Sequence, residues 1–174
     1  MNKKNVTLFF ISLLITLLLF ETGFRLFYPQ KLWDKCVIGH PDSPGRLSMS
    51  DRLLGHLTKP DMQWCLYQPD TNKKITVTTN SKGQRTPHEF TYKKPPNTIR
   101  ILLFGDSFLL ADMLDDDETF QVKLQEEIEK ILKEKYTNQP AVEIIPFSMG
   151  SYGTQQSLLL YLAEGQTYDF DIVM

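Results

Sequence analysis

The 174-residue sequence has few of the residues that build metal, redox or nucleic-acid sites. Its two cysteines, Cys36 and Cys65, are too few for a four-thiolate zinc site and lack the Cys-x-x-Cys spacing of redox motifs. The three histidines, His40, His56 and His88, have no metal-binding spacing, so no metal and no cofactor are expected. The net charge of −2 provides no basic field, which argues against nucleic acid as a partner.

The amino terminus carries the one long apolar run of the sequence, in which residues 5–20 have no charge. A helix over residues 5–24 crosses a hydrocarbon core of about 30 Å, at about 1.5 Å per residue. Lys3 and Lys4 precede the run, and the positive-inside rule then keeps this end in the cytoplasm. No Ala-x-Ala cleavage pattern follows. We therefore predict an uncleaved signal anchor within residues 1–28, in a single-pass membrane protein whose domain is extracytoplasmic.

Residues 29–97 are predicted to be a small β-rich lead-in that ends in a proline-rich linker. Eight of the ten prolines fall between Pro29 and Pro96, which disfavours long helices there. The β-branched run at residues 74–79 is the best candidate strand, and residues 80–83 have the composition of a turn.

The lead-in contains aromatic residues and the two cysteines. Its aromatic side chains can line a sugar-binding surface or form a small core against the main domain, and the core is the commoner outcome for such a region. Because the predicted compartment is oxidising, we also predict a disulfide bond between Cys36 and Cys65. The aromatic residues are Trp33, Trp64, Tyr67 and Phe90.

After residue 97, apolar runs alternate with amphipathic stretches. This alternation of strands and helices predicts right-handed crossovers and a parallel sheet, which is the α/β class, over residues 98–174. The expected strands are 98–104, 141–147 and 170–174. One expected helix begins near Asp117, and a second spans residues 156–164.

An acidic run, Asp115 to Glu118, lies at the predicted start of the first of these helices. Such a run can bind a cation, but a hard-cation loop needs ligands at alternating positions and a glycine turn. Compensation of the helix dipole is the simpler explanation, because carboxylates are favourable at the amino end of a helix.

The candidate chemistry lies in the loops that follow the first two predicted strands. Gly105-Asp106-Ser107 comes directly after the first strand, and open α/β folds keep their sites at this edge of the sheet. Ser107 is therefore a candidate nucleophile, although these residue types are also common in solvated turns. Its amide can face a developing oxyanion. The second strand ends in a similar loop over residues 148–156, whose small residues allow a ligand to approach the backbone.

These blocks resemble the opening blocks of the SGNH (GDSL) hydrolases, particularly membrane-anchored bacterial members. The matching stretches are 101–108, 117–120 and 151–160, and residues 79–85 are similar to a segment often found just before the catalytic domain of that family.

The resemblance implies a flavodoxin-like three-layer fold and the hydrolysis or transfer of acyl esters. Ser107 would be the nucleophile and its amide one oxyanion donor, with Gly105 and Asp106 supporting the turn. The second donor in the family is a glycine amide. Ser151 stands at that glycine position and Gly150 one residue earlier, so the assignment between these two stays open.

The family's oxyanion asparagine and its catalytic Asp and His have no counterpart up to Met174. We therefore expect an amino-terminal fragment that is close to inactive alone, because a serine without a general base is a poor nucleophile. The predicted function is that of an extracytoplasmic esterase or O-acyltransferase acting on an acylated small molecule or cell-surface glycan. The alternative is a non-catalytic, membrane-tethered binding or assembly module with the same fold.

Overall fold

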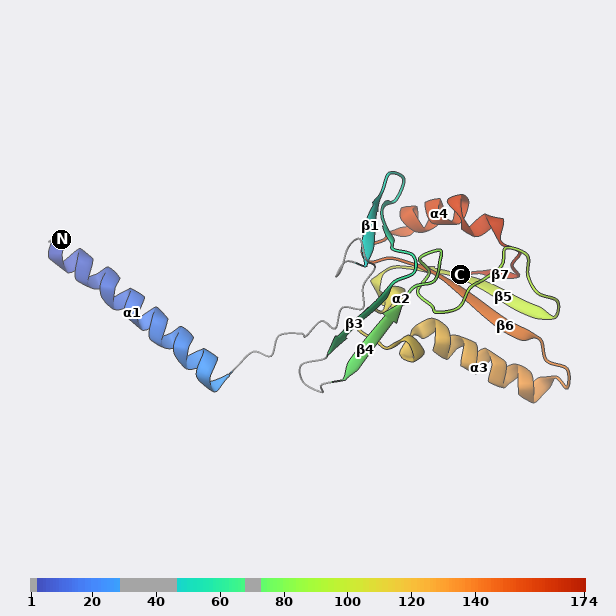
Figure 1. Cartoon of the computed structure of the whole chain (residues 1–174), viewed down its shortest axis with the longest axis horizontal. Helices are drawn as coiled ribbons and strands as arrows, with labels where there is room; N and C mark the ends of the chain where they lie inside the picture. The colour runs from blue at the N-terminus through green and yellow to red at the C-terminus, as the bar shows by residue number, and fades with distance from the viewer. Residues whose placement is uncertain (1–2, 29–46, 68–72) are drawn as a thin grey trace. The chain divides into compact units, whose positions relative to one another are not determined.

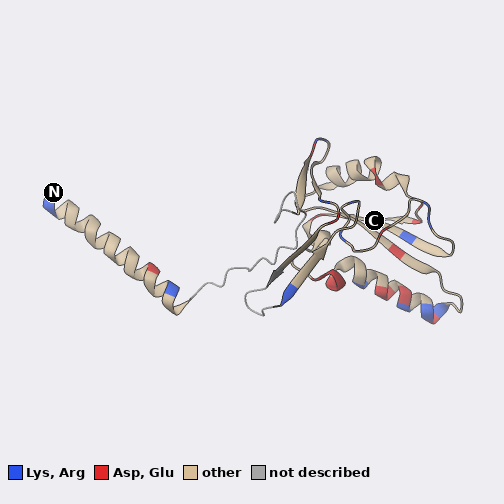
Figure 2. Ribbon diagram, viewed as in Figure 1, with Lys and Arg blue, Asp and Glu red and all other residues tan. Residues whose placement is uncertain are grey.

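The computed structural model describes residues 3–28, 47–67 and 73–174, in two units: one within residues 1–33 and one within residues 34–174. The first unit contains helix α1 (Lys3–Phe27), whose 25 residues are long and apolar enough to cross a membrane (Figure 1). Charged residues occur only near its ends, as Figure 2 shows. The predicted apolar helix is therefore present, while its orientation and its uncleaved state stay predictions.

The second unit begins with two antiparallel hairpins. Strand β1 (Ser48–Asp51) pairs with β2 (Gly55–Thr58), and β3 (Gln63–Tyr67) pairs with β4 (Lys74–Thr78). The predicted strand at 74–79 is thus present as β4. The turn between β1 and β2 closes on Gly55, whose φ of +82° suits glycine.

The aromatic residues of the lead-in that are described lie in cores. Trp64 packs against buried Ile75 and Val77, and Phe90 packs against the cluster around Leu102. These contacts support the core interpretation for both residues. Trp33 and the side chain of Tyr67 lie outside the described residues.

The main sheet has three parallel strands in the order β6-β5-β7. Strand β5 spans Thr98–Gly105, β6 spans Ala141–Ser148 and β7 spans Ile172–Val173. The predicted parallel sheet is confirmed. The first two strands run one residue past their predicted ends, and the third is shorter than predicted.

Helices pack on both faces of this sheet (Figure 1). Because successive residues of a strand point to opposite faces, β5 contributes to two cores. Ile101 and Leu103 pack with α3 (Phe120–Lys135) through Leu124 and Ile128. Leu102, with Ile145 and Phe147 of β6, packs on the opposite side against Leu160 of α4 (Thr154–Ala163). The sheet is therefore the middle of three layers.

The acidic run lies just before the helix rather than in its first turn, and two of its residues have a further role. Helix α3 begins at Phe120 rather than near Asp117, after a 3₁₀ turn η1 (Asp116–Glu118), and its first turn has no acidic residue. The carboxylates of Asp115 and Asp116 instead accept the backbone N–H groups of Thr76 and Thr78, both at 2.9 Å. They satisfy donors along the edge of β4, a long-range role that the local sequence does not reveal.

A buried arginine joins the sheet to neighbouring loops. The sequence pattern, which predicts this strand from its apolar residues, does not reveal this role. Arg100 of β5 is fully buried, and its Nε and Nη2 lie 2.8 and 2.7 Å from the Glu143 carboxylate on β6. Its Nη1 donates to the backbone carbonyls of Thr91, Tyr92 and Asp169, at 2.9, 3.1 and 3.2 Å. One guanidinium thus holds two strands and two loops together.

Candidate functional site

Ser107 stands where the prediction put it, in the turn after β5. It is the first residue of a four-residue helix, α2 (Ser107–Leu110), and it is exposed. Asp106 caps this helix by accepting the N–H of Phe108 at 2.9 Å. Gly105 is required by close packing, because a Cβ there would lie 2.8 Å from Cβ of Leu109. The turn therefore presents a serine hydroxyl at the carboxyl end of the central strand.

The loop after β6 leaves the same edge of the sheet. Gly105 of β5 is in register with Ser148 of β6, so the two loops begin on neighbouring strands. This confirms that both predicted loops lie at one sheet edge. The second loop, residues 149–153, leads into α4, where Gln156 Oε1 accepts the N–H of Gly153 at 2.9 Å.

Ser151, and not Gly150, has the backbone conformation that glycine favours. Its φ is +66°, in the left-handed region that few non-glycine residues adopt. Gly150 is not among the described residues that have a positive φ. Of the two candidate donors that the sequence leaves open, Ser151 is therefore the one with a glycine-like conformation.

Two amides at this edge have no hydrogen-bond acceptor among the described residues. Within the described residues, neither the N–H of Ser107 nor the N–H of Ser151 donates a hydrogen bond to the protein. Unpaired backbone donors are costly when no water reaches them, and they bind anions well at a turn. The arrangement is an exposed hydroxyl with a free amide on each of two adjacent loops.

The described residues bring no general base to Ser107. Among them, no side chain hydrogen-bonds to its hydroxyl, and no group of three metal-ligating side chains is formed. Asp106 is engaged as a helix cap, and His56 contacts the second loop instead. His40 lies outside the described residues.

Strand β2 holds the second loop through side chains that sequence reasoning missed. His56 Nε2 lies 2.8 Å from the carbonyl oxygen of Gly150, and Thr58 Oγ1 donates to the carbonyl of Ser148 at 3.2 Å. In return, the Tyr152 hydroxyl donates to the carbonyl of His56 at 2.6 Å. Burial, with a smaller effect of the Asp51 charge, raises the pKa of Tyr152 to about 12, so this hydroxyl stays protonated at neutral pH.

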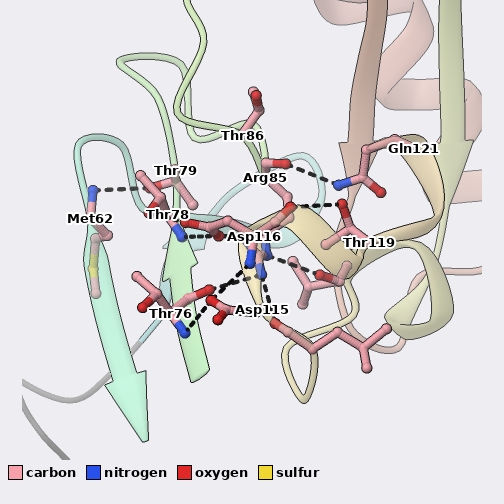
Figure 3. A network of polar contacts seen from close by, with 12 residues as sticks. Met62, Thr76, Thr78, Thr79, Arg85, Thr86, Asp115, Asp116, Thr119 and Gln121 are labelled. Atoms are coloured by element: carbon pink, nitrogen blue, oxygen red, sulfur yellow. Dashed lines mark hydrogen bonds and ion pairs between the residues drawn. The ribbon is translucent and has the colours of Figure 1, made fainter. Parts of the chain in front are cut away.

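Arg85 holds the segment that follows Ser107 (Figure 3). Its guanidinium is buried and donates to the carbonyls of Leu110 and Leu114 at 3.2 and 3.0 Å, and it pairs with the carboxylate of Asp116. The backbone carbonyl of Arg85 accepts from Gln121 Nε2 at 3.1 Å. Arg85 thereby ties the end of α2 and the acidic turn to the lead-in.

A shallow, mostly apolar cavity of about 440 Å³ lies beside the Ser107 turn. It includes Gly105 and Asp106, and its other walls are the apolar side chains of Leu103, Phe104, Phe108, Leu109 and Phe120. Phe108, directly after Ser107, is 89% exposed. A large apolar ring with almost no packing role is thus next to the candidate nucleophile.

Cys65 lies fully buried on β3 and is not a free thiol. Its predicted partner, Cys36, lies outside the described residues, so the pairing stays a prediction. In comparisons of the whole chain, no family model, curated protein or solved structure matches.

Proposed function

We propose that this chain carries the nucleophile and the oxyanion loops of a serine esterase or O-acyltransferase with the SGNH hydrolase fold. The observation that carries the proposal is the convergence, at one sheet edge, of the exposed Ser107 hydroxyl with the free amides of Ser107 and Ser151. Acyl transfer needs these parts: a nucleophile and donors aimed at the oxyanion.

In the proposed reaction, Ser107 Oγ attacks the carbonyl carbon of an acyl ester. The carbonyl oxygen becomes an oxyanion that accepts hydrogen bonds from the two amides, and the alcohol then leaves with a proton. Water or a second hydroxyl removes the acyl group from Ser107. The base that takes the Ser107 proton is not among the described residues, and in the family that the sequence resembles it is a His paired with an Asp.

Two further features support the substrate class. The apolar cavity beside Ser107 fits an uncharged acyl group better than a phosphate or a sugar, because its walls offer few polar partners. Helix α1 is long and apolar enough to hold the protein at a membrane. With the orientation that Lys3 and Lys4 favour, the site would face acylated molecules or glycans outside the cytoplasm.

The test uses the protein encoded by the complete reading frame and p-nitrophenyl acetate as substrate. Ser107→Ala should abolish turnover without changing the melting temperature, because an exposed hydroxyl contributes little to packing. Ser50→Ala, at an exposed serine of β1, is the matched control and should keep full activity. Equal activity of the Ser107→Ala protein and the wild type would contradict the proposal.

One observation favours the alternative of a non-catalytic, membrane-tethered module. The Ser107 hydroxyl has no base beside it among the described residues, and such a serine is unreactive. The two functions differ in the complete reading frame. An Asp-x-x-His sequence near its end supports the enzyme, whereas the absence of both residues supports the module.

A further inference from the structure

The hairpin β1–β2 contacts the second loop through a histidine far away in the sequence. His56 Nε2 lies 2.8 Å from the carbonyl oxygen of Gly150. A carbonyl oxygen can only accept, so Nε2 carries the proton and donates. The Tyr152 hydroxyl donates back to the carbonyl of His56 at 2.6 Å, and the two rings meet edge to face with centroids 5.4 Å apart. Two hydrogen bonds in opposite directions thus join the hairpin to the loop.

The bond from His56 acts on the peptide unit that contains the candidate donor. The carbonyl of Gly150 and the N–H of Ser151 belong to one peptide group, which is planar and trans. In a trans peptide these two bonds point in opposite directions. A carbonyl held toward His56 therefore turns the N–H of Ser151 away from the hairpin.

This peptide needs an external hold. Ser151 has a φ of +66°, a conformation that non-glycine residues keep only when surrounding contacts impose it. Within the described residues, the loop's own turn bond is the long one from Tyr152 N–H to the Met149 carbonyl, at 3.3 Å. The contacts made by His56 and Tyr152, at 2.8 and 2.6 Å, are shorter, so the hairpin restrains the loop at this peptide.

We infer that His56 is a positioning residue that orients the Gly150–Ser151 peptide so that its N–H serves as an oxyanion donor. This inference rests on the proposed function, and it assigns part of the site to the lead-in. His56 acts through Gly150 and does not touch substrate.

The kinetic test compares three variants of the protein encoded by the complete reading frame, with p-nitrophenyl acetate. His56→Leu removes the donor at similar size, His56→Gln keeps an N–H donor at a similar reach, and His88→Leu changes an exposed histidine as the control. Loss of one oxyanion donor lowers kcat by about 10²–10³-fold, so a misaligned donor should lower it by at least about 10-fold. KM should change little, because the oxyanion forms only in the transition state.

His56→Gln should recover most of the lost kcat, and His88→Leu should match the wild type. A His56→Leu protein that keeps its kcat would overturn the inference. So would a His56→Gln protein that is as impaired as His56→Leu, because packing rather than hydrogen bonding would then explain the loss.

A second measurement needs no catalysis. In the 174-residue chain in detergent micelles, NMR should show that His56→Leu shifts the carbonyl ¹³C signal of Gly150 and the amide ¹⁵N signal of Ser151. The turn at Asn80–Gly83, closed by a 2.9 Å bond, is the internal control and should not shift. Unchanged signals at Gly150 and Ser151 would overturn the inference even if Ser107-dependent turnover exists. Shifted signals without any Ser107-dependent turnover would instead refute the proposed function and leave the orienting contact standing.

Discussion

Replacing Arg100 with methionine tests what holds the parallel sheet to the loops around it. Methionine keeps an unbranched apolar stem but none of the five guanidinium donors. The carboxylate of Glu143 then loses its partner on β5, and the carbonyls of Thr91, Tyr92 and Asp169 lose their donor. The variant therefore separates the polar role of Arg100 from the packing of its stem.

The expected loss of stability follows from the abandoned charge. Removing one member of a buried ion pair costs about 3–5 kcal/mol. The Glu143 side chain is 26% exposed, so water can partly hydrate it and the lower end, about 3 kcal/mol, applies. For a domain of this size, about 3 kcal/mol corresponds to a fall of roughly 10 °C in Tm.

The assay is thermal unfolding of the 174-residue chain in detergent micelles, followed by near-UV circular dichroism. This signal reports the packing of aromatic rings in the domain and is insensitive to α1 helicity. The double variant Arg100→Met/Glu143→Met is the matched control, because it also removes the abandoned charge and should recover part of the loss. A decrease in Tm of less than about 3 °C for Arg100→Met would refute the reasoning. So would a double variant that is less stable than the single one.

Three further predictions concern the site and its supports. Asp116→Ala leaves the buried Arg85 guanidinium without its carboxylate, so it should lower the unfolding free energy by about 3 kcal/mol in denaturant titration, whereas exposed Asp117→Ala should cost under about 0.5 kcal/mol. Phe108→Ala should leave Tm unchanged but flatten the rise of kcat/KM from p-nitrophenyl acetate to hexanoate, a rise of up to about 4-fold per CH₂ when the cavity buries the chain. A hydrogen bond from Lys94, followed by one from the backbone of Arg100, lowers the pKa of Asp171 below 3.8, so its contribution is present above that pH and is lost as the pH falls through the lowered pKa. Asp171→Asn should therefore weaken the fall of Tm on acidification below about pH 4, and an unchanged acid profile would contradict this assignment.

The sequence predicts the parts of this fold that depend on local pattern. The apolar runs at residues 98–104 and 141–147 match β5 and β6 to within one residue, because a strand covered on both faces needs apolar residues at successive positions. The alternation of strand and helix likewise predicts the parallel pairing. It also places Ser107 at the carboxyl edge of the sheet, because the direction of β5 determines the edge at which the strand ends.

Pattern fails where distant segments compete for the same groups. Asp115 and Asp116 have the composition of a helix start, but the amides of β4 bind their carboxylates and α3 begins later. Arg100 reads as a polar interruption of a strand, and only the fold shows three carbonyls and a carboxylate converging on it. The choice between Gly150 and Ser151 is also invisible in the sequence, because it depends on a backbone angle that contacts from β2 restrain.

The lead-in is better understood as part of the site than as a spacer. A helix as short as α2 has no stability of its own, and a loop at a sheet edge has no ladder to hold it. The two hairpins instead hold different segments near the site. Strand β2 holds the loop after β6 through His56 and Thr58, and β4 holds the turn after α2 through Asp115 and Asp116. The geometry around Ser107 and Ser151 therefore depends on contacts from β2, β4 and Arg85 as well as on the parallel sheet.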